Sequence, residues 1–260
     1  MTNSIKDSRA VLKFYGVNTL LTAPNANPKV AKNGKQGVLT TALHLAPYNT
    51  SGHQVCPMAS AGCAAACLHT AGNPAYMAGK RRARDARTKA YFAARLDFMA
   101  CLVSDIEKHE HKARSLGMQA GVRLNATSDI RWERVKAERA GVMHENIMKA
   151  FPNVEFYDYT KIHNRKRLPA NYHLTYSLCE DNDAKAAKMI TGRQARVAVV
   201  FDTKRGQALP AYHTIAGVRA RVVDGDEHDF RPIDKGGWII GLRAKGDAIG
   251  DKSGFVRSAA

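Results

Sequence analysis

The 260-residue sequence has no long apolar run, and nothing in it approaches the roughly 18–20 consecutive apolar residues that a membrane span needs. Lys13 interrupts the apolar stretch near the N-terminus, so we expect no secretory signal. The sequence also has no internal repeat and no low-complexity segment, and its hydrophobic content of 45% is typical of globular chains. These absences exclude a membrane protein and a disordered tail, and they favour a protein of the cytoplasm.

The chain has only five cysteines, which is an odd number. Cys56, Cys63 and Cys67 lie close together in the sequence, and Cys101 and Cys179 lie apart from them. An odd count without an export signal argues against a disulfide framework and favours free thiols or metal ligands. The chain also lacks G-x-x-x-x-G-K-[ST], G-x-G-x-x-G and H-E-x-x-H. Nucleoside triphosphatases, Rossmann dehydrogenases and zincin proteases therefore have no support in the sequence.

Acidic residues are outnumbered by basic ones. The chain has 23 Asp and Glu and 40 Lys and Arg, which gives a formal net charge of +17. A basic chain of this kind is typical of nucleic-acid binders, although a basic surface can also serve solubility alone. The basic residues cluster in segments 80–89 and 161–167, where they could neutralise phosphates. We therefore expect a nucleic acid as partner or substrate, DNA rather than RNA. The candidate phosphate contacts are Arg81, Arg82, Arg84 and Lys166.

Strand-like and helix-like segments alternate along most of the chain, which favours a mostly parallel sheet with right-handed crossovers. The expected strands are 37–46, 121–126, 154–160, 172–178, 196–201, 219–223 and 238–242, and the expected helices are 77–115, 132–150 and 183–190. We predict a single α/β domain over residues 37–260, built as a partial or closed (β/α) barrel. Residues 1–36 are expected to form an N-terminal arm of a short strand and loops.

The Cys-rich loop 48–74 has the spacing C-x6-C-x3-C and is the most informative segment of the chain. Three cysteines with His69 as fourth ligand, or His53 in its place, would make a closed tetrahedral zinc site. Three cysteines alone could instead hold a 4Fe–4S cluster and leave one iron open. A third interpretation is structural, with three small residues packed in an alanine-rich turn. The sequence leaves the identity of the metal open.

Carboxylates follow two of the expected strands. Asp224, Asp226 and Asp229 lie within the segment VVDGDEHDFRP, and Asp129 follows the strand at 121–126. Clustered carboxylates bind Mg²⁺, or shift one another's pKa so that one serves as acid and another as base or nucleophile. The alternatives are a solvated turn for the first group and a helix N-cap for Asp129.

The segment VEFYDYTK adds two further candidates, because alternation along a strand places Tyr159 and Lys161 on the same face. Tyr159 could stack on a base, and Lys161 could contact a phosphate or donate a proton. Aromatic residues of strands also commonly belong to the core, and that alternative stays open here.

Several phrases together resemble a phage-encoded family akin to the mycobacteriophage gene-product-88 family: HQVCPMASAGCAAACLHTAG, GVRLNATSDIRWE, FPNVEFYDYTK, NYHLTYS and VVDGDEHDFRP. The resemblance covers most of the chain from about Val38 to Gly246, and it implies a phage gene expressed in the cytoplasm of a bacterial host. It assigns no catalytic residues. At the level of layout, the chain is also similar to the guanine transglycosylases and to radical-SAM enzymes, although its cysteine spacing differs from both patterns.

These observations lead to three functional hypotheses. The first is a DNA base-exchange enzyme, a transferase in which Asp226, or Asp129, attacks a flipped nucleotide while a second carboxylate moves the proton. The second is a radical-SAM-like enzyme with an iron–sulfur cluster on the three cysteines. The third is a non-catalytic nucleic-acid-binding protein with a structural zinc site. The substrate base and the oligomeric state cannot be deduced from the sequence.

Overall fold

The computed structural model describes residues 4–24, 26, 28–70, 77–193 and 195–259. Nine of its strands form one sheet in the order β1-β2-β5-β6-β7-β10-β9-β8, with β11 beside β7. All neighbouring strands of this sheet are parallel except β8 and β9. The strands are β1 (Val38–Ala42), β2 (Gln119–Arg123), β3 (Ala137–Arg139), β4 (Val142–His144), β5 (Val154–Thr160), β6 (Tyr172–Ser177), β7 (Arg196–Phe201), β8 (Tyr212–Ile215), β9 (Val218–Asp224), β10 (Ile239–Arg243) and β11 (Val256–Arg257).

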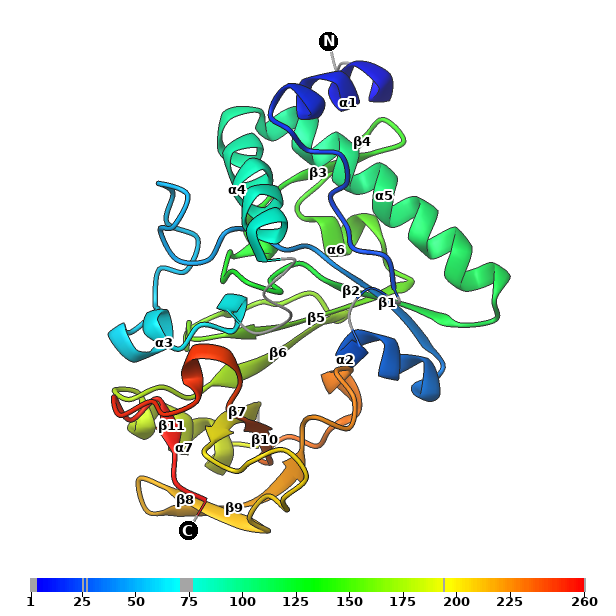
Figure 1. Ribbon diagram of the computed structural model, residues 1–260. Coiled ribbons are helices and arrows are strands. Elements are labelled where there is room, and N and C mark those ends of the chain that lie inside the picture. The colour runs from blue at the N-terminus through cyan, green and yellow to red at the C-terminus, as the bar shows by residue number, and fades with distance from the viewer. Residues whose placement is uncertain (1–3, 25, 27, 71–76, 194, 260) are drawn as a thin grey trace.

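Helices α1 and α2 precede the first strand, and the other α-helices lie in the connections between strands (Figure 1). The α-helices are α1 (Ile5–Phe14), α2 (Pro28–Ala31), α3 (Ala61–Ala65), α4 (Met77–Ala93), α5 (Arg95–Ser115), α6 (Ile147–Ala150) and α7 (Asp183–Thr191). Short 3-10 turns are η1 (Lys32–Gln36), η2 (Leu68–Thr70), η4 (Trp132–Arg134), η5 (Arg231–Ile233) and η6 (Gly246–Ala248). The predicted mixed α/β fold with a mostly parallel sheet is confirmed. Among the described residues no closed barrel is detected.

All seven expected strands are present, but the helix expected over residues 132–150 is wrong. That segment instead holds η4, the hairpin of β3 and β4, and the short helix α6. The hairpin turns at Ala140 and Gly141, whose φ angles are 51° and 77°. Two successive positive φ angles define a tight hairpin turn that matches the twist of the two strands and ends any helix. The expected helix 77–115 is in fact two helices, α4 and α5, separated at Ala94.

The first 36 residues contain helices that pack against the rest of the chain. Ser4 caps α1 by accepting a hydrogen bond from the backbone N–H of Asp7 at 3.2 Å. Ser8 donates to Asp97 of α5 at 2.9 Å, and the guanidinium of Arg9 pairs with Asp105 of the same helix. In Figure 1, α1 therefore lies across α5 at the end of the molecule opposite β8 and β9.

Two groups of buried side chains form the core. The larger group packs α5 and the hairpin β3–β4 against β1, β2 and β5, with Phe98, Leu102 and Trp132 fully buried. The smaller group packs α7 against β7, β9 and β10, around Val199 and Phe201. Each parallel strand is covered in this way, so the carboxyl edge of the sheet remains for function. Within the described residues, no helix combines the length and the apolar character that crossing a membrane requires.

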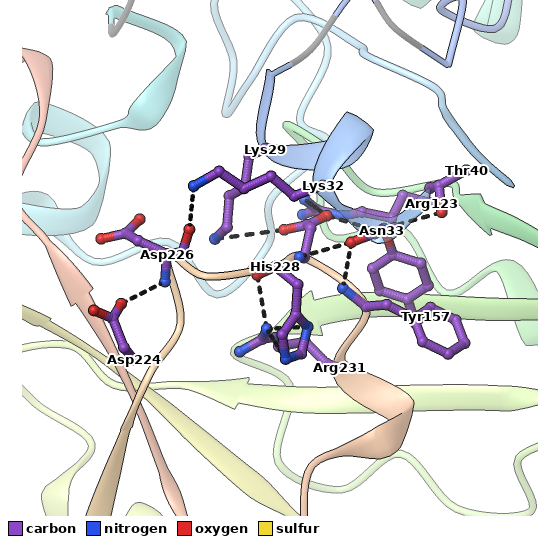
Figure 2. A network of polar contacts seen from close by, with 12 residues as sticks. Lys29, Lys32, Asn33, Thr40, Arg123, Tyr157, Asp224, Asp226, His228 and Arg231 are labelled. Atoms are coloured by element: carbon purple, nitrogen blue, oxygen red, sulfur yellow. Dashed lines mark hydrogen bonds and ion pairs between the residues drawn. The ribbon is translucent and has the colours of Figure 1, made fainter. Parts of the chain in front are cut away.

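The segment before β1 and the loop after β9 are joined by a buried polar network (Figure 2). The fully buried Asn33 of η1 accepts hydrogen bonds from the backbone N–H groups of Asp229 and Phe230 at 2.8 and 2.9 Å. Its amide nitrogen donates to Tyr157 Oη at 2.9 Å and to Thr40 Oγ1 at 3.0 Å. One side chain thus links β1, β5 and the loop after β9, and it brings distant parts of the carboxyl edge together.

Candidate active site

A cavity of about 240 Å³ opens at the carboxyl edge of the parallel sheet. Its walls come from the ends of β2, β5, β6 and β10, from the Cys-rich loop and from the segment near β11. Functional residues of parallel α/β sheets lie at this edge, where loops from different strands meet. The lining residues named in the sequence analysis are Cys56, Cys63, Cys67, Asp129, Tyr159, Lys161 and Asp226.

All three clustered cysteines line this cavity, while Cys101 is buried in α5. Burial raises the pKa of the Cys56 thiol to about 12, and the nearby thiols of Cys67 and Cys63 add to the shift. A buried thiol with such a raised pKa is a poor nucleophile, which argues against nucleophilic catalysis by Cys56.

Each of the three thiols has a positive or hydrogen-bonding neighbour. The backbone N–H of Tyr48 donates to Cys56 Sγ at 3.4 Å. Lys161 lies beside Cys63, whose charge and hydrogen bond raise the lysine pKa against the effect of burial. The charge of Cys67 favours the protonated form of Arg84 on α4, but burial outweighs it and lowers the pKa of this arginine. Donors of this kind stabilise thiolate sulfur and the negative charge of a metal–thiolate group.

Glu180, which follows β6, holds the Cys-rich loop over the cavity. Its carboxylate accepts hydrogen bonds from Ser60 Oγ at 2.7 Å and from the backbone N–H of Gly62 at 2.6 Å. Ser60 also caps α3 by accepting from the backbone N–H of Cys63. A Cβ atom at Gly62 would lie 2.1 Å from Ser253 Oγ and 2.9 Å from both Glu180 carboxylate oxygens, so any larger residue would displace these side chains.

The structure describes the side chains of only some residues of the predicted metal site. The side chain of His69 lies outside the described residues. Among the side chains that are described, no group of three or more His, Cys, Asp and Glu is placed to hold a metal ion. His53, the reserve ligand, stacks on Phe92 with ring centroids 4.3 Å apart.

Asp129 lies in the cavity wall and does not cap a helix. Its carboxylate accepts a hydrogen bond from the backbone N–H of Lys161 at 2.8 Å, and Arg165 Nη1 lies 3.6 Å away. Oδ1 of Asp129 is buried and has no hydrogen-bond partner among the described residues. Burial raises the pKa of Asp129, and the contacts from Lys161, Thr160 and Arg165 offset only part of that shift. A carboxyl group of this kind holds its proton more readily than an exposed carboxylate does, which makes it a candidate for proton transfer.

The three clustered carboxylates after β9 have different positions. Asp226 lines the cavity and pairs with Lys245 at 2.6 Å and with Arg243 at 3.2 Å. Lys245, the charge of Lys29 and the backbone N–H of Arg243 hold its pKa below the ordinary value against the effect of burial. Asp224 is not among the lining residues and pairs with Arg243 at 2.9 Å. Asp229 is fully buried behind the wall, in the network of Figure 2.

The residues expected to contact phosphate do not gather at the cavity. Arg81 and Arg82 are exposed on α4, Lys166 is exposed in the loop after β5, and Arg84 is half-buried beside Cys67. Tyr159 is the member of the expected nucleic-acid set that lines the cavity. The surface position of Arg81, Arg82 and Lys166 leaves them available to a large anionic partner.

Four cationic residues of the cavity were not among the sequence candidates: Lys29, Arg123, Arg243 and Lys245. Arg243 directly follows the expected strand 238–242, so its position was a usable signal. Arg123 is the last residue of β2 but lies inside the expected strand 121–126, so its place at the strand end could not be predicted. The approach of Lys29 from α2 depends on the network around Asn33, which no local pattern reveals.

The fold and the cavity together define an α/β protein with a candidate active site at the carboxyl edge of a mostly parallel sheet. The chain belongs to the gene product 88 family, whose family model matches residues 17–259, and the resemblance seen in its motifs is thereby confirmed. No curated protein and no solved structure matches the chain.

Proposed function

We propose that the protein is an iron–sulfur enzyme that holds a 4Fe–4S cluster on Cys56, Cys63 and Cys67, comparable to the radical-SAM enzymes. The observation that carries the proposal is the convergence of these three thiols on one cavity at the carboxyl edge of the sheet. A cluster with three cysteine ligands supplies one-electron chemistry and keeps one iron open to a small molecule.

The number of thiols at the cavity matches the ligand number of a four-iron cluster with one open iron. A structural zinc ion would need a fourth ligand at about 2.0–2.3 Å of one centre. The ligands of a four-iron cluster bind different iron atoms, so their sulfur atoms stand farther apart. Lys161 and Arg84 supply the positive charge that favours thiolate ligands at Cys63 and Cys67.

The chain's own groups supply the remaining functions of the site. Asp129, with a raised pKa and an Oδ1 that accepts no hydrogen bond among the described residues, is the candidate for holding or moving a proton. Lys161 stands between Asp129 and Cys63 and keeps positive charge at the cavity wall. Glu180 fixes the part of the Cys-rich loop that carries Ser60 and Gly62, close to Cys63.

The test is the metal content of protein purified without oxygen, compared between the wild type and three single variants, Cys56→Ala, Cys63→Ala and Cys67→Ala. We expect iron and acid-labile sulfide with a broad absorption band near 400 nm in the wild type, and loss of all three signals in each variant. Cys101→Ala is the matched control, because Cys101 is buried in α5. Colourless wild-type protein without iron and sulfide would reject the proposal.

A second candidate function, DNA base exchange, is favoured by one observation. Asp226 and Asp129 line the same cavity, and their surroundings shift their pKa values in opposite directions. Paired groups with separated pKa values are typical of an ionised nucleophile and a proton carrier. The ion pairs of Asp226 with Arg243 and Lys245 weaken it as a nucleophile, so we place this function second.

Nucleoside analysis of DNA from cells that express the protein tests this second function. A modified nucleoside that disappears with Asp226→Asn and with Asp129→Asn, but persists with the control Asp85→Asn on α4, would support base exchange. An unchanged nucleoside content in cells with wild-type protein and with the two cavity variants would reject it.

A further inference from the structure

One wall of the cavity gathers two cations around a single tyrosine. Arg123 stands at the end of β2, Tyr159 near the end of β5, and Lys29 in α2. The guanidinium carbon of Arg123 lies 5.0 Å from the centre of the Tyr159 ring, and Lys29 Nζ lies 6.0 Å from the same centre. We call these three residues the anion wall. The cluster proposal makes no use of them.

Two polar groups of the anion wall are buried without a hydrogen-bond partner among the described residues. They are the hydroxyl of Tyr159 and Nε of Arg123. Leaving a buried donor unpaired costs about 1–3 kcal/mol, and native proteins commonly satisfy such groups with water or a ligand. Nε of Arg123 can only donate and the Tyr159 hydroxyl is able to donate, so an oxygen atom with negative charge would satisfy both groups.

The charges around the cavity favour the same kind of partner. Lys29 and Arg123 both line the cavity and share one carboxylate, that of Asp229, so the anion wall has two positive charges for one negative charge. In a cavity partly shielded from water, this excess attracts anions more strongly than it would in bulk solvent.

The ion pairs of Asp229 also fix the positions of the Arg123 and Lys29 side chains in the anion wall. Arg123 Nη1 donates to Asp229 Oδ2 at 2.9 Å, and Lys29 Nζ lies 3.4 Å from Asp229 Oδ1 (Figure 2). The carboxylate of Asp229 also accepts from Tyr157 Oη at 3.1 Å. Asp229 therefore holds both cations in place, and little rearrangement is needed when an anion binds.

We propose that the anion wall binds the phosphate or carboxylate group of the molecule that the cavity takes. The inference deepens the proposed function, on which it rests, by naming the class of substrate: a small molecule with one oxyanion group. The guanidinium and ammonium groups offer charge-assisted hydrogen bonds, and the Tyr159 hydroxyl adds a neutral donor. The uncharged part of the substrate faces the apolar side chains of Leu178, Val200, Leu242 and Phe255.

Calorimetric titration with inorganic phosphate, and separately with malonate, tests the anion wall on the full-length protein. Tyr159→Phe removes only the hydroxyl, and Lys29→Gln removes one charge from a partly exposed side chain. Each lost donor should weaken binding roughly tenfold, the fold-change that corresponds to a charge-assisted hydrogen bond. Lys35→Gln, an exposed position in η1, is the control for simple loss of charge and should bind as the wild type does.

Tighter binding of phosphate than of malonate identifies a phosphate group in the substrate, and the reverse identifies a carboxylate. Absence of binding by both anions would overturn the inference, as would equal loss of affinity in Lys35→Gln. Thermal melts of the three variants show whether each is folded, and Tyr159→Phe keeps the ring that packs in the wall. Iron is measured on the same samples, so anion binding without iron would reject the cluster alone, and iron without anion binding would reject the anion wall alone.

Discussion

Arg123 Nη1 donates a hydrogen bond to Asp229 Oδ2 across 2.9 Å, which joins the last residue of β2 to the loop after β9. Asp229 is fully buried, and the side chain of Arg123 is 13% exposed. Burial alone raises the pKa of Asp229, but Arg123 and Lys29 outweigh it and keep the carboxylate ionised. The pair therefore holds together two strands that stand far apart in the sheet order.

Asp229→Ala should strongly destabilise the protein, because it leaves the charges of Arg123 and Lys29 without their shared carboxylate. Removing one partner of a buried ion pair costs about 3–5 kcal/mol. Denaturant unfolding of the variant should show that loss in the free energy of unfolding. The exposed pair of Asp85 and Lys89 on α4 offers a control, since Asp85→Ala should change stability by less than about 1 kcal/mol. Equal effects of the two substitutions would contradict the account of the Arg123–Asp229 pair.

Asp158 should make stability depend on pH. Burial raises its pKa to about 7 in the folded protein, while the unfolded chain loses this proton near pH 4. Between these values the folded state binds the extra proton, so stability is greatest at low pH and falls as pH rises toward about 7. Asp158→Asn stays neutral and lacks this contribution.

The measurement for Asp158 is the difference in unfolding free energy between wild type and Asp158→Asn at several pH values. The difference should shift in favour of the variant by up to about 1.4 kcal/mol per pH unit between pH 4 and 7 and then level off. The lost hydrogen bond from Tyr172 adds a constant offset, because Tyr172 stays neutral in this range. A difference that does not vary with pH would show that Asp158 is ionised in the folded state.

Glu180→Ala should loosen the Cys-rich loop without removing a thiol. The variant loses the hydrogen bonds from Ser60 and from the backbone of Gly62, which fix α3 beside the cavity. We expect iron content per protein to fall several-fold while the chain stays folded, because the cysteines are then less well organised for a common ligand. Glu138→Ala, in the β3–β4 hairpin, is the matched control. Iron content that is the same in both variants would argue against the positioning role of Glu180.

Much of the sheet could be predicted from the sequence, because each of the seven expected strands has a local apolar pattern between turn residues. The hairpin of β3 and β4 was missed because its turn at Ala140 and Gly141 interrupts a segment with helix-like spacing. Strand β8, at the edge of the sheet beside β9, was missed for another reason. Its residues are largely exposed, so they lack the apolar pattern that predicts a strand.

The candidate site was predictable only in part. The cysteines, Asp129, Lys161 and Asp226 could be found because they follow strands, and the carboxyl ends of parallel strands meet at one edge. The separation of Asp229 from Asp226 could not be predicted, because Asn33, distant in sequence, draws the backbone of Asp229 into the interior. The role of Lys29 depends on the same long-range contact.

The most direct test of the account is the iron and acid-labile sulfide content of the wild-type protein, purified without oxygen and compared with Cys63→Ala. Cys63 is the decisive position, because its thiol lines the cavity and lies beside Lys161. The account predicts about four iron and four sulfide per chain in the wild type, with both lost in the variant. Wild-type protein that contains neither iron nor sulfide, or that keeps both after the substitution, would contradict it.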